Sequence, residues 1–250
     1  MGWRPATVDK YPTRQAIVRA ALGMELWRLM SRTYAIADLH GRFDLLKLAL
    51  ESIASHAANE EYKIVTLGDY VDRGPESRQV IQHLMEAQAA GKPLICLKGN
   101  HEDMMHRTLT TPFASDWWAR YGGETTLKSY DNEVPSNHLN WIKRLPVTHV
   151  DRYRIFVHAG IDPTKSMDEQ TEEFMLWHRY PQNADIGYDG RHVVHGHTPN
   201  TRGPEKYRNR TNLDTLAWRT GRLVVGVFDD ERAGPATDYV EVKKSRWLGL

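Results

Sequence analysis

The chain has 250 residues, of which 40% are hydrophobic and 26% are charged, a composition typical of a globular protein with one large domain. The formal net charge is +1, which excludes a strong overall field that would attract nucleic acid or anionic lipid. The single cysteine, Cys96, excludes an internal disulfide. Because Cys96 lies in the apolar run PLICL, we expect it to be part of the core rather than a nucleophile.

Residues 1–32 are predicted to form an amphipathic helical extension. Six Lys/Arg and two Asp/Glu give this segment a net charge of 6 − 2 = +4, and charged residues interrupt its apolar runs, unlike in a signal peptide. No apolar stretch of the chain approaches the ~20 residues of a membrane span. We therefore expect a docking extension rather than a membrane-surface helix, followed by one domain over residues 33–250. A cytoplasmic location is expected, because one cysteine suits a reducing compartment.

Five short apolar runs are predicted to be buried strands. They cover residues 33–38, 62–69, 93–100, 153–160 and 191–198. Helical patterns separate the first three runs, which indicates βαβ units and an α/β fold. Two further runs, at residues 223–228 and 238–242, follow with no helix between them, so we expect a pair of antiparallel strands there.

Each of the five runs ends in residues that can bind a metal or a phosphate. In chain order these are Asp38 with His40, Asp69 with Asp72 and Arg73, Asn100 with His101, His158, and His197. Ligands of open α/β sheets bind outside the carboxyl ends of the strands, so we expect these groups to converge on one site. Strand ends often carry Asp or Asn simply because these residues turn well, but five such endings in a row favour a shared function.

The candidate ligands offer two carboxylates, one amide oxygen, three imidazoles and no thiolate. They are Asp38, His40, Asp69, Asn100, His158 and His197. This set suits Mn, Fe or Zn, of which we favour Mn, and its size suits two divalent ions rather than one. Two such ions would clamp a phosphoryl group and would lower the pKa of a bridging water, so that hydroxide is present near neutral pH.

The stretch GDYVDRG, residues 68–74, supplies further groups for phosphate chemistry. Asp69 would bridge the two metals, and Arg73 would hold phosphate oxygens with its fork of donors. Asp72 would pair with His101, which would then stay protonated more readily and could pass a proton to the leaving oxygen. The glycines at both ends allow a tight turn and a close approach to an anion.

The motifs DLH, GDYVDRG, GNHE, HAG and GHT, in this order over residues 36–198, closely resemble the phosphoprotein phosphatase family of metallophosphoesterases, most of all its bacterial and bacteriophage members. The resemblance implies a calcineurin-like domain with a four-layer α/β/β/α sandwich of mixed sheets, with the metals at one edge. Eukaryotic members carry HGG where this chain has HAG, so their substrate grooves are not assumed.

The resemblance also implies a role for each candidate residue. Asp38, His40 and Asp69 would bind one metal, and Asp69, Asn100, His158 and His197 would bind the second. His101 would be the acid, oriented by Asp72. Arg73 would bind phosphate, and so would Arg179, which matches the family in the tripeptide WHR at residues 177–179.

The favoured activity is hydrolysis of phosphoserine, phosphothreonine or phosphotyrosine in proteins by direct attack of a metal-bridging hydroxide. The alternative is symmetrical hydrolysis of diadenosine tetraphosphate, by family members that tend to lack the acidic residue found here as Asp72 and to read GNHD instead of GNHE. A third hypothesis is a binding module that recognises phosphorylated ligands without turnover. Such modules usually lose a metal ligand or the acid, and neither is missing here. No nucleic-acid partner is expected.

Two further histidines and one segment are left open by the sequence. His195 could pair with His197 as a metal ligand, although we expect it to be a strand residue. His178 could touch substrate, although this is not the favoured interpretation. The segment 112–130, which contains Trp117 and Trp118, reads as neither a strand nor a clean helix. It could be a substrate-binding insertion or a small satellite core.

Overall fold

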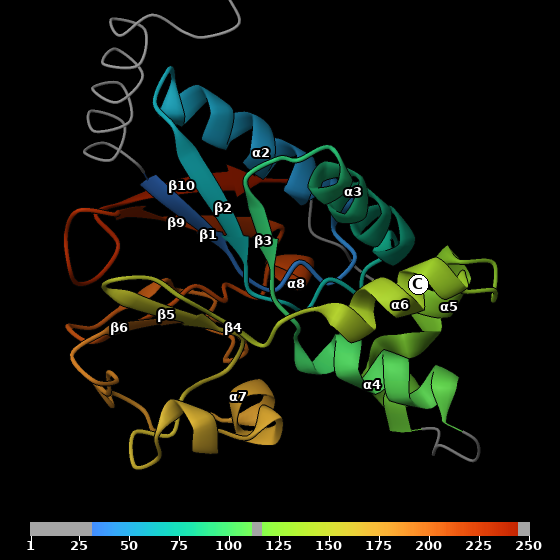
Figure 1. The fold of residues 1–250 in the computed structure, drawn as a ribbon. Coiled ribbons are helices and arrows are strands. Elements are labelled where there is room, and N and C mark those ends of the chain that lie inside the picture. The colour runs from blue at the N-terminus through green and yellow to red at the C-terminus, as the bar shows by residue number, and fades with distance from the viewer. Residues whose placement is uncertain (1–31, 112–116, 245–250) are drawn as a thin grey trace, which may run out of the picture.

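Two five-stranded sheets pack face to face in the computed structural model of the chain, which describes residues 32–111 and 117–244 (Figure 1). The strand order is β10-β9-β1-β2-β3 in the first sheet and β4-β5-β6-β8-β7 in the second. The helix predicted within residues 1–32 lies outside the described residues, apart from Arg32, which begins the first strand.

The first sheet contains the predicted βαβ units. Strands β1 (Arg32–Ile36), β2 (Tyr62–Thr66) and β3 (Leu94–Cys96) are parallel, and helices α2 (Phe43–Ala57) and α3 (Ser77–Ala89) connect them. Strands β9 (Arg222–Asp229) and β10 (Asp238–Lys243) complete the sheet as the predicted antiparallel pair. The strands end before the predicted runs do, because the last residues of each run leave the sheet as loops.

The second sheet is also mixed, and its strands are short. Strands β5 (Arg154–Val157), β6 (His192–His195) and β8 (Arg210–Asn212) are parallel. Strands β4 (Thr148–Val150) and β7 (Glu205–Lys206) lie antiparallel at its two edges. Only β5 and β6 were predicted from the sequence, because strands of two or three residues have no readable periodicity.

The remaining helices lie around the ends and outer faces of the sheets (Figure 1). They are α4 (Asn100–Thr110), η1 (Ala119–Gly123), α5 (Glu124–Ser129), α6 (Ser136–Arg144), η2 (Met167–Glu169), α7 (Glu172–Trp177) and α8 (Ala217–Thr220). The segment that reads as neither strand nor clean helix is therefore helical over residues 119–129. Its first turn is a π-helix that contains Gly122 at φ 104°, an irregularity that removes the regular 3.6-residue pattern.

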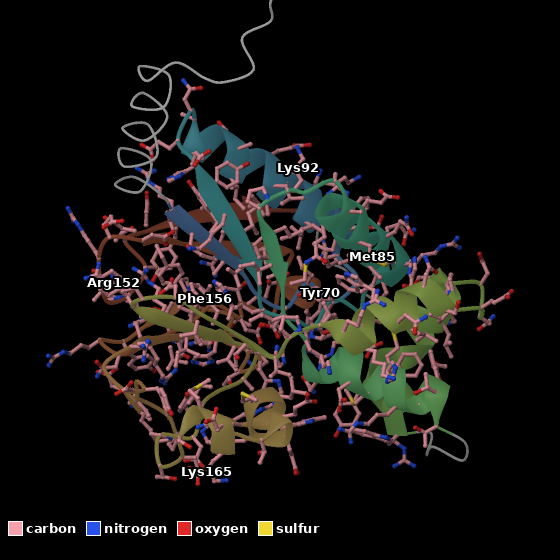
Figure 2. All side chains as sticks on the ribbon, viewed as in Figure 1. Tyr70, Met85, Lys92, Arg152, Phe156 and Lys165 are labelled. Atoms are coloured by element: carbon pink, nitrogen blue, oxygen red, sulfur yellow. The ribbon has the colours of Figure 1, made fainter. Side chains whose placement is uncertain are left out.

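Apolar side chains fill three spaces between four layers, which confirms the α/β/β/α sandwich. Between the sheets, Val65 and Phe228 of the first sheet meet Phe156 and Val194 of the second (Phe156 is labelled in Figure 2). Helices α2 and α3 cover the outer face of the first sheet, and α7 packs on the outer face of the second. Cys96 is buried in the first of these helix-covered cores, as expected. Among the described residues no helix is long and apolar enough to cross a membrane.

Candidate active site

The loops at the carboxyl ends of the parallel strands bring the predicted ligands together from both sheets. Asp38 and His40 follow β1, Asp69 follows β2, Asn100 begins α4 after β3, His158 follows β5 and His197 follows β6. All six side chains are buried. The site is therefore built across the junction of the two sheets, at the edge where the strand-end rule predicts it.

Asp69 lies at the centre of this arrangement. Its Oδ2 is 3.4 Å from Nε2 of His40, and its Oδ1 is 3.3 Å from Nε2 of His158. The same His158 nitrogen is 2.9 Å from Oδ1 of Asn100 and 3.2 Å from Nδ1 of His197. The donor atoms form two groups that share Asp69, one with His158 and His197 and the other with His40 and His101.

The hydrogen bonds of His40 and His158 show which nitrogen of each ring carries a lone pair. Nδ1 of His40 lies 2.8 Å from the carbonyl of Val71, and Nδ1 of His158 lies 2.9 Å from that of Leu67. A carbonyl only accepts, so each Nδ1 carries the proton and each Nε2 presents a lone pair. The lone pair of His158 thus faces carboxylate and amide oxygens, which are also acceptors. Such a convergence fits a divalent cation, whose histidine ligands are commonly fixed by this second hydrogen bond.

Two carboxyl groups at the site, those of Asp38 and Asp214, hold their protons more tightly than usual, because they are buried. Burial raises the pKa of Asp38 well above its ordinary value, and the neighbouring charges of Asp214 and Asp69 raise it further. Burial likewise raises the pKa of Asp214 to about 6. For Asp69 burial is outweighed by the imidazoles of His158 and His101, so its pKa is lowered. Divalent cations would neutralise this crowding, which supports the fit of the residues to metal.

Asp38 makes a different contact from the one its proposed role requires. Both of its carboxylate oxygens accept the backbone N–H of His197, at 3.2 and 3.1 Å. The group around His40 and Asp69 contains His101 in the place where Asp38 was expected. Asp38 nevertheless joins the loop after β1 to the loop after β6, and so links the two sheets at the site.

Arg73 lies inside the site, whereas Arg179 is exposed at its edge. The guanidinium of Arg73 donates to Nε2 of His40 at 2.7 Å and reaches Nε2 of His101 at 3.0 Å. Burial is the main cause that lowers the pKa of His197 to about 3, and the positive charge of Arg179 contributes to that lowering. Both arginines therefore bring positive charge to the place where an anion would bind.

His101 is held by Asp72 as the sequence analysis expects. Nδ1 of His101 is 2.6 Å from Oδ2 of Asp72, and its Nε2 is 3.9 Å from Oδ2 of Asp69. Burial lowers the pKa of His101, but the charge of Asp69 and the hydrogen bond to Asp72 outweigh burial and raise it overall. A ring that keeps its proton beside the ligand cluster suits a general acid.

Two residues that hold Asp72 were not predicted. The indole of Trp118 donates to Oδ2 of Asp72 at 2.9 Å, and the hydroxyl of Thr126 donates to Oδ1 at 2.6 Å. Both come from the segment that contains η1 and α5. The sequence analysis left a substrate-binding insertion and a satellite core open for this segment, and its contacts place Trp118 and Thr126 against the Asp72–His101 pair.

Glu102 is a further supporting residue that the sequence analysis did not identify. Its buried carboxylate accepts the backbone N–H groups of Gly99 and Asp69 on Oε2, at 2.9 and 2.8 Å, and those of Tyr70 and Val71 on Oε1, at 2.8 and 3.2 Å. The available signal was the capping box at the start of α4, with Glu102 at its third residue. Glu102 therefore clamps the loop that carries Asp69.

The backbone is strained where the candidate residues lie. Non-glycine residues with positive φ include Asp38 (35°), His40 (43°), Asp69 (56°), Asp72 (75°), Arg73 (68°) and His197 (64°). Asp and His tolerate this region better than most side chains do, but each such residue still costs free energy. A cluster of these residues around one point indicates a functional site.

Two histidines that the sequence left open point elsewhere. Nε2 of the buried His195 faces the guanidinium of Arg210 at 3.1 Å, and the ring of His178 stacks on Phe174 with centroids 4.2 Å apart. Neither ring is in the two groups of potential metal ligands found among the described residues.

Burial raises the pKa of Cys96 to about 12, as suits a core thiol.

A fold of two mixed sheets with a strained, histidine-rich site at their shared edge is that of a metallophosphoesterase. Residues 31–227 match the family described as calcineurin-like phosphoesterase, and the chain belongs to this family. It is accordingly a metal-dependent phosphoesterase.

Two curated relatives are bis(5'-nucleosyl)-tetraphosphatases. The chain is 33% identical to the symmetrical enzyme of Pseudomonas fluorescens (strain SBW25) over 134 residues, which cover 52% of this chain and 44% of that relative. It is 27% identical to the asymmetrical enzyme PrpE of Bacillus thuringiensis (strain Al Hakam) over 218 residues, which cover 75% of this chain and 87% of that relative. The match thus spans less than half the length of the symmetrical relative.

Solved structures share the fold at low sequence identity. A protein serine/threonine phosphatase from Saccharomyces cerevisiae aligns with a TM-score of 0.61 and 15% identity, over 96% of this chain and 93% of that chain. A metallophosphoesterase from Sphaerobacter thermophilus aligns with a TM-score of 0.56 and 21% identity, over 86% and 89%. These likenesses confirm the fold class.

Proposed function

We propose that this chain is a metal-dependent hydrolase of dinucleoside polyphosphates such as diadenosine tetraphosphate. The observation that carries the hydrolase chemistry is the convergence of three imidazoles and Asp69 beside the Asp72–His101 pair. The names of the two curated relatives support this substrate class. The sequence analysis ranked it second, behind phosphoproteins, because the motifs alone favoured a protein phosphatase.

Two divalent ions would be held by the predicted ligands. Asp38, His40 and Asp69 would hold one, and Asp69, Asn100, His158 and His197 would hold the other. Mn is the favoured metal, and Fe or Zn would suit the same donors. When bound, the ions would polarise the phosphoryl group and make water a stronger nucleophile.

The other candidate residues would act on the phosphate and on the leaving group. Arg73 and Arg179 would bind the phosphoryl oxygens, as guanidinium groups do with charge-assisted hydrogen bonds. In the structure Nε2 of His101 accepts from Arg73 at 3.0 Å. Once Arg73 turns to the phosphoryl oxygens and this nitrogen is protonated, His101 would hand the proton to the leaving oxygen, while Asp72 keeps the ring in place. Because the leaving group needs only this proton, the same residues would serve a nucleotide or an alcohol.

Phosphoproteins remain the second candidate substrate. The intact Asp72–His101 pair and the GNHE sequence favour a protein phosphatase within this family resemblance. The non-catalytic binding module is disfavoured, because no predicted ligand is missing from the chain, and His40, Asp69, His158 and His197 lie in two adjoining groups beside the predicted acid His101. We further propose that residues 33–250 form one domain preceded by an extension over residues 1–32, and that the protein is cytoplasmic.

Initial rates on two substrates test this proposal. The purified protein would be stripped of metal, supplied with Mn²⁺, and assayed on diadenosine tetraphosphate and on a phosphoserine peptide. We expect faster cleavage of the nucleotide and little activity of Asp69→Asn on either substrate. Faster phosphate release from the peptide would move the function to phosphoproteins. Wild-type rates no higher than those of Asp69→Asn on both substrates would contradict the hydrolase itself.

A further inference from the structure

We infer that Trp117, Tyr121 and Trp177 form a binding site for the nucleobase of the leaving nucleotide. These three rings are called the aromatic cluster below. The inference rests on the proposed function, because it names the part of the substrate that the cluster would recognise. It adds a site for a planar ring to a centre that otherwise contains only groups for metal and phosphate.

The aromatic cluster borders the ligand cluster at two points. The ring of Tyr121 lies 6.3 Å from that of His101, and the ring of Trp177 lies 6.2 Å from that of His197. Trp117 contacts both other members, at 5.7 Å from Tyr121 and stacked at 5.9 Å on Trp177. The three rings, which come from two distant segments of the chain, therefore form one continuous surface beside the candidate acid and a candidate metal ligand.

Part of this surface is open to solvent. The side chain of Tyr121 is 44% exposed, and it is the single aromatic one among the exposed large hydrophobic side chains of the described residues. Trp117 and Trp177 are half-buried. Aromatic side chains stabilise a fold most when they are buried. Trp117 and Trp177 also pack against the core on their buried sides, but core packing does not explain the exposed surface of the cluster, above all that of Tyr121, which a flat ligand could cover.

The cluster is fixed in place by the machinery it adjoins. Trp118, next to Trp117, donates to Asp72, and so does Thr126 on the far side of Tyr121. The carbonyl of Gly122 accepts the backbone N–H of Arg73 at 3.4 Å. A platform anchored on both sides loses little conformational entropy when a flat ligand stacks on it.

The chemistry around the cluster matches a nucleotide better than a phosphorylated side chain. Arg73 and Arg179 provide positive charge for the phosphates, whereas the cluster offers neutral π surfaces. A nucleotide has the same division into an anionic phosphate and a neutral planar base, and bases stack well on Trp and Tyr. Phosphoserine and phosphothreonine have no ring, and phosphotyrosine has one small ring bonded directly to the phosphate oxygen, whereas a nucleobase is larger and is separated from the phosphate by the ribose. Because Tyr121 lies beside His101, which would protonate the leaving oxygen, the base at the cluster would belong to the leaving nucleotide.

Equilibrium binding of two non-hydrolysable probes to the Mn²⁺-loaded protein tests this inference. The probes are α,β-methylene adenosine diphosphate and methylenediphosphonate, which lacks the base, and both are measured by titration calorimetry. We expect the wild type to bind the adenosine probe about ten-fold more tightly, as one stacked base would give. In Tyr121→Ala and Trp177→Leu the ratio of the two affinities should fall towards one, because binding of the adenosine probe weakens while the affinity for methylenediphosphonate is unchanged. Tyr153→Ala, just before the amino end of β5, is the matched aromatic control and should keep the preference.

Three results would overturn the inference. They are equal affinity for both probes in the wild type, an undiminished preference in both variants, and an equal loss of affinity for both probes, which would indicate a purely structural role. Because the readout is binding, it separates this inference from the proposed function. A protein that fails to cleave diadenosine tetraphosphate but keeps a cluster-dependent preference for the base would still have the nucleobase site.

Discussion

Asp72 makes three buried side-chain contacts, to His101, Trp118 and Thr126. These contacts hold the Asp72 carboxylate, which is not one of the predicted metal ligands, against the His101 ring. Its effect on catalysis would therefore pass through the position and protonation of the His101 ring. This distinguishes Asp72 from Asp69, which would contact both metals, and makes the two carboxylates separable by mutation.

Replacing Asp72 by Asn should lower kcat while leaving metal content unchanged. Loss of general acid catalysis typically costs about 10²- to 10⁴-fold, and we expect a loss near the lower end because His101 itself remains. Steady-state kinetics with metal analysis would measure both quantities. The double variant Asp72→Asn/His101→Asn should be no slower than His101→Asn, since residues that act as a unit are not additive. A multiplicative loss would argue against the pair.

Replacing Glu102 by Gln should destabilise the fold, since an amide has one acceptor oxygen where the carboxylate accepts four backbone N–H groups. The NH₂ group of the glutamine would face two of these backbone donors, which should lower the free energy of unfolding by about 2–4 kcal/mol. Urea denaturation would measure it. Glu51→Gln, on the exposed face of α2, is the control and should change stability little. Equal stabilities for the two variants would contradict the clamp.

At the scale of elements, the strand-end rule located the candidate ligands because it depends on topology rather than on exact strand bounds. It did not identify Asp214, the buried carboxyl group after β8 whose charge acts on Asp38, because that strand has three residues and no readable pattern. The contact of Thr126 with Asp72 joins residues 54 positions apart. Local propensity carries no information on such a pairing, so the support of Asp72 could not be predicted from the sequence.

Strand β6 begins with a buried histidine, His192, that should make stability depend on pH. Its Nε2 is 2.8 Å from the Thr211 hydroxyl on β8, and its Nδ1 is 3.1 Å from the carbonyl of Arg208. Burial lowers the pKa of His192 to about 4. The folded state thus favours the neutral ring. In the unfolded chain the pKa of this histidine is about 6.5. The contribution of His192 to the free energy of unfolding is therefore complete above that pH and declines as the pH falls towards 4.

His192→Asn, which keeps a donor for the Arg208 carbonyl, should therefore flatten the decline. We expect the stability difference between neutral and acidic solution to shrink by about 1–3 kcal/mol. Urea unfolding at pH 7 and pH 4.5, with excess chelator so that metal release does not contribute, would measure it. The same decline in the variant and the wild type would contradict the assignment to His192.

At the scale of the whole molecule, the site joins the two sheets. Asp38, His40 and Asp69 lie in loops that follow strands of the first sheet, and His158 and His197 lie in loops that follow strands of the second. The family resemblance predicted this sandwich and the edge where the residues meet, and the structure confirms the fold. The motifs favoured phosphoproteins as substrates, whereas the names of the curated relatives favour dinucleoside polyphosphates. The motifs could not separate these two classes, because the same metal-binding and phosphate-binding groups serve both.

A site built from both sheets should couple metal binding to stability. Ligands that bind only the folded state raise its stability by mass action, so saturating Mn²⁺ should raise the melting temperature by about 5 °C or more over the chelator-treated protein. Differential scanning calorimetry would show it. Asp69→Asn should lose most of this increase, and an increase equal to that of the wild type would place the bound metal elsewhere.

The most direct test of the central claim, a dinuclear metal centre at Asp69, is anomalous diffraction from crystals of the Mn²⁺-loaded protein. We expect two manganese peaks that share Asp69, one beside His40 and one beside His158 and His197, with at least one peak lost in Asp69→Asn. A single peak, or peaks that do not touch Asp69, would contradict it.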